Sequence, residues 1–234
     1  MGYRISLDNV SYKYPGQNRY SVSEISIKFN PGIVYGLIGS NGAGKTTLLK
    51  IIALIYKPNK GKLLYNNSDP WNNVVFYRRS IAYVHEKPIM IRASVYNNLA
   101  YPLKIRGISK EEINKRIDRV SRLFGIQDLL GKNAKTLSTG EKQIIGIARA
   151  LIYDPEVIVL DEPFSNLDYH KRRILLDVID SQASQGKTII LASHDTLMIE
   201  KISSKILVLE NGKALCFGPT RQIIEKLYEY SCNS

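Results

Sequence analysis

The chain has 234 residues, of which 44% are hydrophobic and 23% are charged, and its formal net charge is +12 at pH 7. This composition excludes global disorder and supplies enough apolar side chains for one large domain, or for one domain with an inserted lobe. The only cysteines, Cys216 and Cys232, exclude a disulfide framework and a cysteine metal cluster. We expect Cys216 to be a small core residue and Cys232 to be a thiol in the tail.

Hydropathy and charge indicate where the chain resides and which partners it can bind. The N-terminus lacks an apolar signal segment, and no apolar run approaches the roughly 20 residues that span a bilayer. The sequence therefore predicts a soluble, cytoplasmic chain. A basic surface favours anionic partners such as nucleotides, anionic lipid headgroups or nucleic acid. Because no basic arm stands out, solvated faces explain most of the lysines, a membrane-adjacent surface ranks second, and nucleic acid ranks third.

The N-terminal third has the pattern of short strands and turns around one helix. Residues 22–29 alternate between apolar and polar, and a Pro31-Gly32 turn precedes a buried apolar stretch. Residues 45–54 carry apolar side chains at helical spacing. We expect strands at 5–10, 22–29, 33–38 and 81–84, and a helix at 45–54.

The rest of the chain combines a helical middle with further strands. Ser109 with Glu112 and Ser138 with Glu141 form two capping boxes, each ahead of apolar residues at helical spacing. We expect further strands at 157–160, 188–192 and 206–209, and a helix around 174–179 that ends by Gly186. Strands and helices alternating on both sides of a helical middle predict an α/β sheet with a helical insertion at roughly 86–150.

A glycine-rich loop joins the strand at 33–38 to the helix that follows it. Its sequence, Gly-Ser-Asn-Gly-Ala-Gly-Lys-Thr, has the P-loop pattern in the expected context of strand, loop and helix. Glycines let backbone N–H groups curl around phosphate oxygens, and the helix directs its positive end at the same anion. We expect Lys45 to reach the β- and γ-phosphates and the hydroxyl of Thr46 to serve Mg²⁺. The expected ATP-binding residues of this loop are Gly39, Ser40, Asn41, Gly42, Ala43, Gly44, Lys45, Thr46 and Thr47.

A P-loop alone does not separate a kinase, a GTPase, a motor and a transporter ATPase. A second acidic site narrows the choice, because the apolar stretch 157–160 ends in Asp161-Glu162. Alone, such a pair is structural more often than catalytic. Beside a P-loop, Asp161 can hold the Mg²⁺ shell and Glu162 can polarise a water molecule aimed at the γ-phosphate.

The order and spacing of these features resemble the ATP-binding-cassette (ABC) transporter ATPases over the whole chain. The resemblance rests on an aromatic segment at Tyr12-Lys-Tyr14, the signature Leu137-Ser-Thr-Gly-Glu141, the acid pair, the D-loop Ser165-Asn-Leu-Asp168 and the switch histidine in Ser193-His194-Asp195. It implies a P-loop NTPase (RecA-like) core at 1–85 and 151–234, an N-terminal antiparallel β subdomain and a helical subdomain at 86–150. It also implies that Tyr14 stacks on adenine and that Lys45, Glu162 and His194 are catalytic. His85 and His170 match no family role and are expected at the surface.

The signature has a physical interpretation of its own. Ser138 caps a helix whose free N–H groups and positive dipole can bind a phosphate. In isolation it would be an ordinary cap. The resemblance implies that Ser138, Thr139, Gly140 and Glu141 bind the ATP of a second chain, which is either another copy or a paralogous subunit. It also identifies Asp168 as the D-loop residue.

Three positions depart from the family pattern. Thr139 replaces the first glycine of the signature, and Glu141 replaces the usual glutamine while completing the capping box. Glu86 occupies the place of the Q-loop glutamine. Our hypothesis is that Glu86 is partly directed at Mg²⁺, beside Thr46 and Asp161, with its charge offset by the metal and Lys45.

The residues beside the Q-loop indicate which proteins the chain binds. In the family this surface receives a helix of the membrane permease, and we expect Pro88, Ile89, Met90 and Tyr101 to form the exposed groove. The stretch 87–107 resembles the short ATPases of tungstate-type oxyanion importers, which favours import and adds an extracytoplasmic solute-binding protein to the expected complex. The chain would then lie peripherally on the inner face of the cell membrane. The alternatives are an exporter or lipid-handling ATPase and a soluble ABC ATPase acting on nucleic acid or ribosomes. The sequence shows neither the long coiled-coil insertion of the DNA-repair type nor the second cassette of the ribosome type, so we expect no nucleic-acid partner.

Overall fold

Two β-sheets and the helices packed on them make up the computed structural model, which describes residues 2–232, with side chains described through residue 227. A three-stranded antiparallel sheet has the order β2-β1-β4. A six-stranded sheet has the order β5-β6-β7-β3-β8-β9, in which only β9 runs antiparallel to its neighbour. The strands are β1 (Ile5–Tyr12), β2 (Val22–Phe29), β3 (Val34–Ile38), β4 (Lys60–Tyr65), β5 (Ile81–Val84), β6 (Val157–Asp161), β7 (Thr188–Ala192), β8 (Lys205–Glu210) and β9 (Lys213–Pro219).

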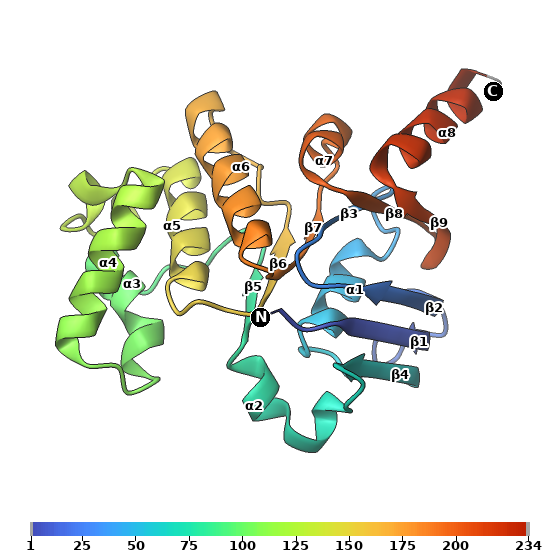
Figure 1. Ribbon diagram of the computed structural model, residues 1–234, viewed down its shortest axis with the longest axis horizontal. Helices are drawn as coiled ribbons and strands as arrows, with labels where there is room; N and C mark the ends of the chain where they lie inside the picture. Colours follow the sequence, from blue (N-terminus) through green and yellow to red (C-terminus); the bar gives the residue numbers. More distant parts are fainter. Residues whose placement is uncertain (1, 233–234) are drawn as a thin grey trace.

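The helices surround the two sheets on several sides (Figure 1). Helix α1 lies beside the antiparallel sheet, whereas α3, α4 and α5 gather at the far end of the molecule. The helices are α1 (Lys45–Ile52), α2 (Val74–Arg78), α3 (Val95–Lys104), α4 (Lys110–Phe124), α5 (Thr139–Leu151), α6 (Tyr169–Ser184), α7 (Thr196–Ile202) and α8 (Thr220–Cys232). Among the described residues, no helix combines the length and apolar character needed to cross a bilayer.

Alternation along the central strands divides the core in two. In β6, Val157 and Val159 join the cluster that contains α1 and the antiparallel sheet, whereas Ile158 and Leu160 join the cluster that contains α3 to α6. Successive side chains of a strand point to opposite faces, so a strand covered on both faces must be apolar throughout. This is why β3, β6 and β7 are buried at every position. Because these strands run parallel, their carboxyl ends meet at one edge of the sheet.

The predicted fold class is confirmed. The strands at 22–29, 33–38, 81–84, 157–160, 188–192 and 206–209 occur within a residue or two of their predicted bounds. The first strand extends to Tyr12 across an irregularity at Asn9, whose φ is 52°. The predicted helix at 45–54 ends at Ile52, because Leu54 adopts a φ of 57°.

The helical middle contains α3, α4 and nearly all of α5, and the division at 86–150 remains a proposal. Cys216 is only partly buried on β9, so its prediction as a core residue is half right. The side chain of Cys232 lies outside the described residues. His85 and His170 are exposed, as expected.

Candidate functional site: a nucleotide cavity and its surroundings

The glycine loop between β3 and α1 has a backbone that side chains would obstruct. Gly39, Gly42 and Gly44 have φ values of 155°, 81° and 103°. A Cβ at Gly44 would lie 2.4 Å from the carbonyl oxygen of Ser21, and one at Gly39 would lie 2.3 Å from that of Leu209. A Cβ at Gly42 would meet nothing within 4 Å. The loop is therefore packed against the protein at two glycines and open at the third, as a cradle for a ligand requires.

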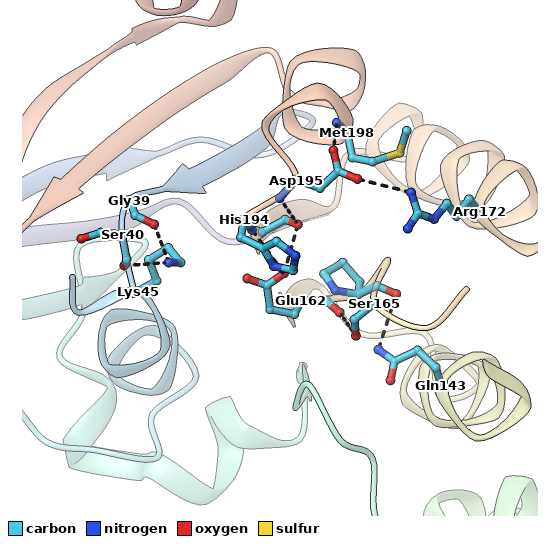
Figure 2. Close-up of polar contacts among 12 residues, drawn as sticks. Gly39, Ser40, Lys45, Gln143, Glu162, Ser165, Arg172, His194, Asp195 and Met198 are labelled. Atoms are coloured by element: carbon cyan, nitrogen blue, oxygen red, sulfur yellow. Dashed lines mark hydrogen bonds and ion pairs between the residues drawn. The ribbon is translucent and has the colours of Figure 1, made fainter. Parts of the chain in front are cut away.

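Lys45 is held at the mouth of this loop. Its side chain is 8% exposed, and Nζ donates to the carbonyl oxygens of Gly39 at 2.7 Å and Ser40 at 3.1 Å (Figure 2). The ammonium group thus lies directly over the glycine cradle, at the N-terminus of α1. This position is the one predicted for a cation that binds phosphate.

Asp161 ends β6 beside the loop. It is 4% exposed, and it accepts hydrogen bonds from the Tyr83 hydroxyl at 3.2 Å and from Thr46. Burial raises the pKa of the Asp161 carboxyl, and the bonds from Thr46 and Tyr83 oppose that rise. Burial and the neighbouring Asp161 charge also raise the pKa of Tyr83, which keeps its hydroxyl protonated as a donor. Asp161 and Thr46, which were each predicted to serve Mg²⁺, are therefore in direct contact, and Tyr83 is a neighbour of Asp161 that sequence reasoning missed.

Glu162 is fixed from several directions. Its Oε2 accepts from Ser193 Oγ at 3.1 Å and from the backbone N–H of His194 at 3.2 Å, and it lies 2.8 Å from His194 Nδ1 (Figure 2). Its backbone has a φ of 50°, and its N–H donates to Ala192 O on β7. A non-glycine residue in this conformation is strained and persists only where its surroundings hold it. The structure thus brings Glu162 and His194 together.

The segment after β7 is also anchored. Asp195 caps α7 by accepting from Met198 N–H at 3.1 Å, and it pairs with Arg172 of α6 at 3.3 Å (Figure 2). Helix α6 is itself capped by Asp168, which accepts from Lys171 N–H at 2.9 Å. The hydrogen bond from the Lys171 side chain lowers the pKa of the Asp168 carboxyl most, and the bond from the Lys171 backbone N–H lowers it further. The predicted D-loop residue therefore also serves as a helix cap.

The glycine loop, Lys45, Asp161 and Glu162 border one cavity of about 350 Å³. The predicted residues Tyr14 and Glu86 reach it from other parts of the chain. Its lining is Tyr14, Ser21, Asn41, Gly42, Ala43, Gly44, Lys45, Thr46, Thr47, Glu86, Asp161 and Glu162. The signature residues and Asp168 do not line this cavity. Three other predicted residues lie one contact away from the lining: Gly39 and Ser40 accept hydrogen bonds from Lys45, and His194 contacts Glu162.

Tyr14 lies in a group of aromatic rings at the cavity. Its hydroxyl is 3.0 Å from Thr47 Oγ1, and its ring meets those of Tyr12 and Tyr56 edge-on at 5.3 Å and 5.6 Å. Tyr12 and Tyr56 stack in parallel, with centroids 5.0 Å apart. Sequence reasoning did not select Tyr56, because its part in this group depends on the tertiary contact with Tyr12. Of these three rings, only that of Tyr14 lines the cavity, and the rings of Tyr12 and Tyr56 pack against it.

The signature forms the capped start of α5. Ser138 Oγ accepts from Glu141 N–H at 3.2 Å, and Ser138 N–H donates to Glu141 Oε2 at 2.7 Å, so the predicted capping box is confirmed. That backbone bond from Ser138 lowers the pKa of Glu141. A Cβ at Gly140 would lie 2.6 Å from the carbonyl oxygen of Asn166, so the second signature glycine is needed for contact with the D-loop. Thr139 replaces glycine at the first helical position, where the backbone is ordinary helix.

A second hollow, which we call the groove, lies beside the nucleotide cavity and has a volume of about 600 Å³. Pro88, Ile89 and Tyr101 line it as predicted, and Ile89 and Tyr101 are 84% and 51% exposed. The prediction for Met90 is wrong, because its side chain packs on the core of the helical end rather than lining the groove. Lys87 and Arg149 carry the positive charges of the groove lining. Among the described residues, no carboxylate lines the groove.

Comparisons with known proteins agree with this geometry. A family model described as "ABC transporter" matches residues 22–165. The chain is 36% identical to the "Tungstate uptake system ATP-binding protein TupC" of Peptoclostridium acidaminophilum, over 90% of this chain and 96% of the relative. It is 32% identical to the "Molybdate/tungstate import ATP-binding protein WtpC" of Pyrococcus abyssi, over 94% of this chain but 63% of that longer relative.

Solved structures show the same relationship. An "ATP binding subunit of ABC transporter" matches with a TM-score of 0.87 and 26% identity, covering 96% of this chain and 93% of that one. The cbiO1 protein of Clostridium perfringens, described as part of the ABC transporter complex cbiONQ, matches with a TM-score of 0.85 and 27% identity, covering 96% and 92%. The chain therefore belongs to the ABC transporter family and is one of its ATP-binding, ATP-hydrolysing subunits.

Proposed function

We propose that this chain is the ATPase of a membrane importer for an oxyanion of the tungstate and molybdate class. The observation that carries the proposal is a nucleotide cavity and an exposed apolar groove side by side on one chain. The relative named for tungstate uptake, matched over nearly its whole length, supports the oxyanion class. Because relatives named for methionine import are also similar, the solute is decided by other subunits of the complex.

The cavity residues divide the chemistry between them. Lys45, the N–H groups of the glycine loop and the positive end of α1 bind the phosphates of ATP, and the Tyr14 ring stacks on adenine. The known hydrogen bonds to Glu162 all end on Oε2, so Oε1 is the oxygen that accepts a proton from the attacking water. His194 holds Glu162 in place and contacts the γ-phosphate from the same side.

The oxygen groups in the cavity fit Mg²⁺. Thr46 supplies a hydroxyl, and Asp161 and Glu86 supply carboxylates, which are the hard oxygen donors that this ion prefers. When bound, the ion neutralises charge on the phosphates. No group of three or more histidine, cysteine, aspartate or glutamate side chains in residues 2–227 lies close enough to hold a metal. Oxygens of ATP and water molecules would complete the shell, because Mg²⁺ usually combines one or two carboxylates with phosphate oxygens and water.

The signature supplies the second half of each ATP site. Ser138, Thr139, Gly140 and Glu141 lie outside the cavity of their own chain, at the free N-terminal end of a helix. A second copy, or a paralogous subunit, placed head to tail would bring that helix end to the γ-phosphate. Asp168 and its D-loop would then lie between the two sites. ATP binding would drive the chains together, and hydrolysis would release them.

The groove is the proposed contact with the permease. Pro88, Ile89 and Tyr101 present an apolar surface to a helix of the membrane subunit, whereas Met90 belongs to the core beneath it. In this proposal the chain lies peripherally on the inner face of the cell membrane, and a solute-binding protein works on the opposite side. Nucleic acid has no part in this function.

Purification of the chain with its membrane subunit and binding protein tests the proposal. In a reconstituted complex, we expect tungstate or molybdate to stimulate ATP hydrolysis and sulfate or methionine to stimulate it less. Stimulation by methionine alone would overturn the oxyanion assignment. ATP-dependent release of the oxyanion from vesicles, in place of uptake, would indicate an exporter.

A further inference from the structure

One loop borders both the nucleotide cavity and the groove. Residues 86–94, between β5 and α3, are here called the linking loop. Glu86 at its start lines the nucleotide cavity, whereas Pro88, Ile89 and Ile91 line the groove. A change in the position of this loop would therefore alter the surface offered to a partner in the groove.

A buried amide fastens the loop to α3. Asn98 is 0% exposed, and its Oδ1 accepts from the N–H of Ile91 at 2.9 Å. Its Nδ2 donates to the carbonyl oxygens of Ile91 at 3.1 Å and Ser94 at 3.0 Å. A buried polar side chain persists where its hydrogen bonds are satisfied, and here the linking loop supplies the partners.

The signature helix contacts the same loop through two residues one turn apart. Arg149 donates to Asn98 Oδ1 at 3.2 Å through one terminal nitrogen and to Ile89 O at 2.7 Å through the other. At Gly146, a Cβ would lie 2.5 Å and 2.7 Å from the Cβ and Cγ atoms of Pro88. The loop is therefore pressed onto α5 at Gly146 and tied to it by Arg149.

The opposite end of α5 carries the signature. A helix of 13 residues is about 20 Å long at about 1.5 Å per residue. A rigid element of this kind can carry coupling between groups packed at its two ends. Ser138 caps one end, and the linking loop is attached near the other. Displacement of the signature end therefore has a direct mechanical route to the groove.

We propose that Arg149, together with Asn98, is a positioning residue that transmits movement of the signature helix to the linking loop and so to the groove. This inference rests on the proposed function, in which the signature end of α5 engages the ATP of a second chain. The planar guanidinium is essential because it reaches two acceptors from two elements at once. A lysine ammonium keeps the charge but is a single point donor that cannot bridge the pair in this geometry.

Hydrogen–deuterium exchange of the full chain tests the inference, in a Glu162→Gln background that retains ATP. Saturating Mg²⁺-ATP is expected to slow exchange in the glycine loop, at residues 40–47, and in part of the linking loop, at residues 89–94. Adding Arg149→Lys should reduce the ATP-dependent slowing in the linking loop at least about threefold, while the slowing at 40–47 persists as the internal reference. Gly146→Ala should have the same effect, because its Cβ displaces Pro88.

Arg122→Lys is the matched control, since Arg122 makes an exposed ion pair within α4. It should leave both regions unchanged. Full ATP-dependent slowing at 89–94 in Arg149→Lys would overturn the inference. So would a parent chain that slows at 40–47 but not at 89–94, and that outcome would leave the proposed function standing. A parent chain in which ATP slows neither region counts against the proposed function itself. If Arg149→Lys lacks a cooperative thermal transition, Gly146→Ala decides.

Discussion

At the residue scale, Glu162 combines strain with dense hydrogen bonding. Its φ is 50°, and three groups from Ser193 and His194 contact one carboxylate oxygen. Such a conformation costs on the order of 1–3 kcal/mol and is retained where function requires the side chain to point in one direction. The direction here is into the nucleotide cavity, beside Lys45 and Asp161.

Glu162→Gln separates binding from chemistry. The amide has the shape of the carboxylate but cannot accept a proton from water, so we expect turnover to fall by about 10²–10⁴. Binding of ATP should persist, because the glycine loop and Lys45 are unchanged. Phosphate release and equilibrium ATP binding check the two parts, with the exposed Glu210→Gln as control. Turnover within twofold of the unmodified chain would remove Glu162 as the base.

Tyr14→Ala tests the base contact. Loss of stacking should weaken ATP binding by about 1–3 kcal/mol, whereas Tyr14→Phe should bind nearly as the unmodified chain does because it keeps the ring. Titration with a fluorescent ATP analogue measures the difference. Unchanged affinity in Tyr14→Ala would assign the contact to Tyr12 or Tyr56, or show that no ring stacks there.

Two glycines of the loop give a paired test. Gly42→Ala should cost on the order of 1 kcal/mol, since its φ of 81° disfavours a side chain but its Cβ meets nothing within 4 Å. Gly44→Ala should cost more and abolish ATP binding, because its Cβ would lie 2.4 Å from Ser21 O. Thermal unfolding and ATP titration of both variants check the order. Equal behaviour of the two would show that the close approach at Gly44 does not shape the cradle.

At the element scale, α5 joins the signature to the rest of the molecule. Its capping box orders the helix end that is proposed to meet a second chain's ATP. The carboxylate of Glu141 belongs to that box and has a lowered pKa because Ser138 N–H donates to it. The stability of this element should therefore depend on pH.

The sign of that dependence follows from the lowered pKa. Folding favours the Glu141 carboxylate, so its contribution is complete above the ordinary value of 4.5 and is lost as pH falls through the lower folded pKa. Urea unfolding should show Glu141→Gln less stable than the unmodified chain at pH 7, with the gap narrowing below pH 4.5. Ser138→Ala should cost about 1 kcal/mol at pH 7. A gap for Glu141→Gln that widens on acidification would contradict this account.

Local patterns predict some of these elements well and others poorly. Strands such as β6 and β7 are buried on both faces and therefore appear as unbroken apolar runs. Helix α3 was not predicted, because Asn97, Asn98 and Pro102 interrupt its apolar pattern. Asn98 is polar for a tertiary reason, since its partners lie in the linking loop.

Local sequence patterns also predict only part of the candidate nucleotide site. Lys45, Asp161 and Glu162 could be predicted because their motifs are contiguous. Tyr56 and Tyr83 could not, because their contacts with Tyr12 and Asp161 depend on the folded arrangement. Met90 was misplaced because a single apolar stretch supplies both core and groove, and only the packing distinguishes them.

At the scale of the whole molecule, the two halves of the proposed ATP site lie apart on one chain. Lys45 and Glu162 line the cavity, whereas Ser138 begins a helix outside it. A single chain can bind ATP at the cavity but cannot bring its own signature to that nucleotide. Each complete site, as proposed, therefore needs two chains.

The molar mass of Glu162→Gln, measured by light scattering with and without saturating Mg²⁺-ATP, tests this requirement most directly. Without nucleotide we predict the 26.5 kDa of one chain, and with ATP we predict twice that mass. Adding Ser138→Arg, which places a bulky side chain at the helix end, should prevent the doubling. A chain that binds ATP yet remains at 26.5 kDa would contradict a composite site shared by two copies of this chain.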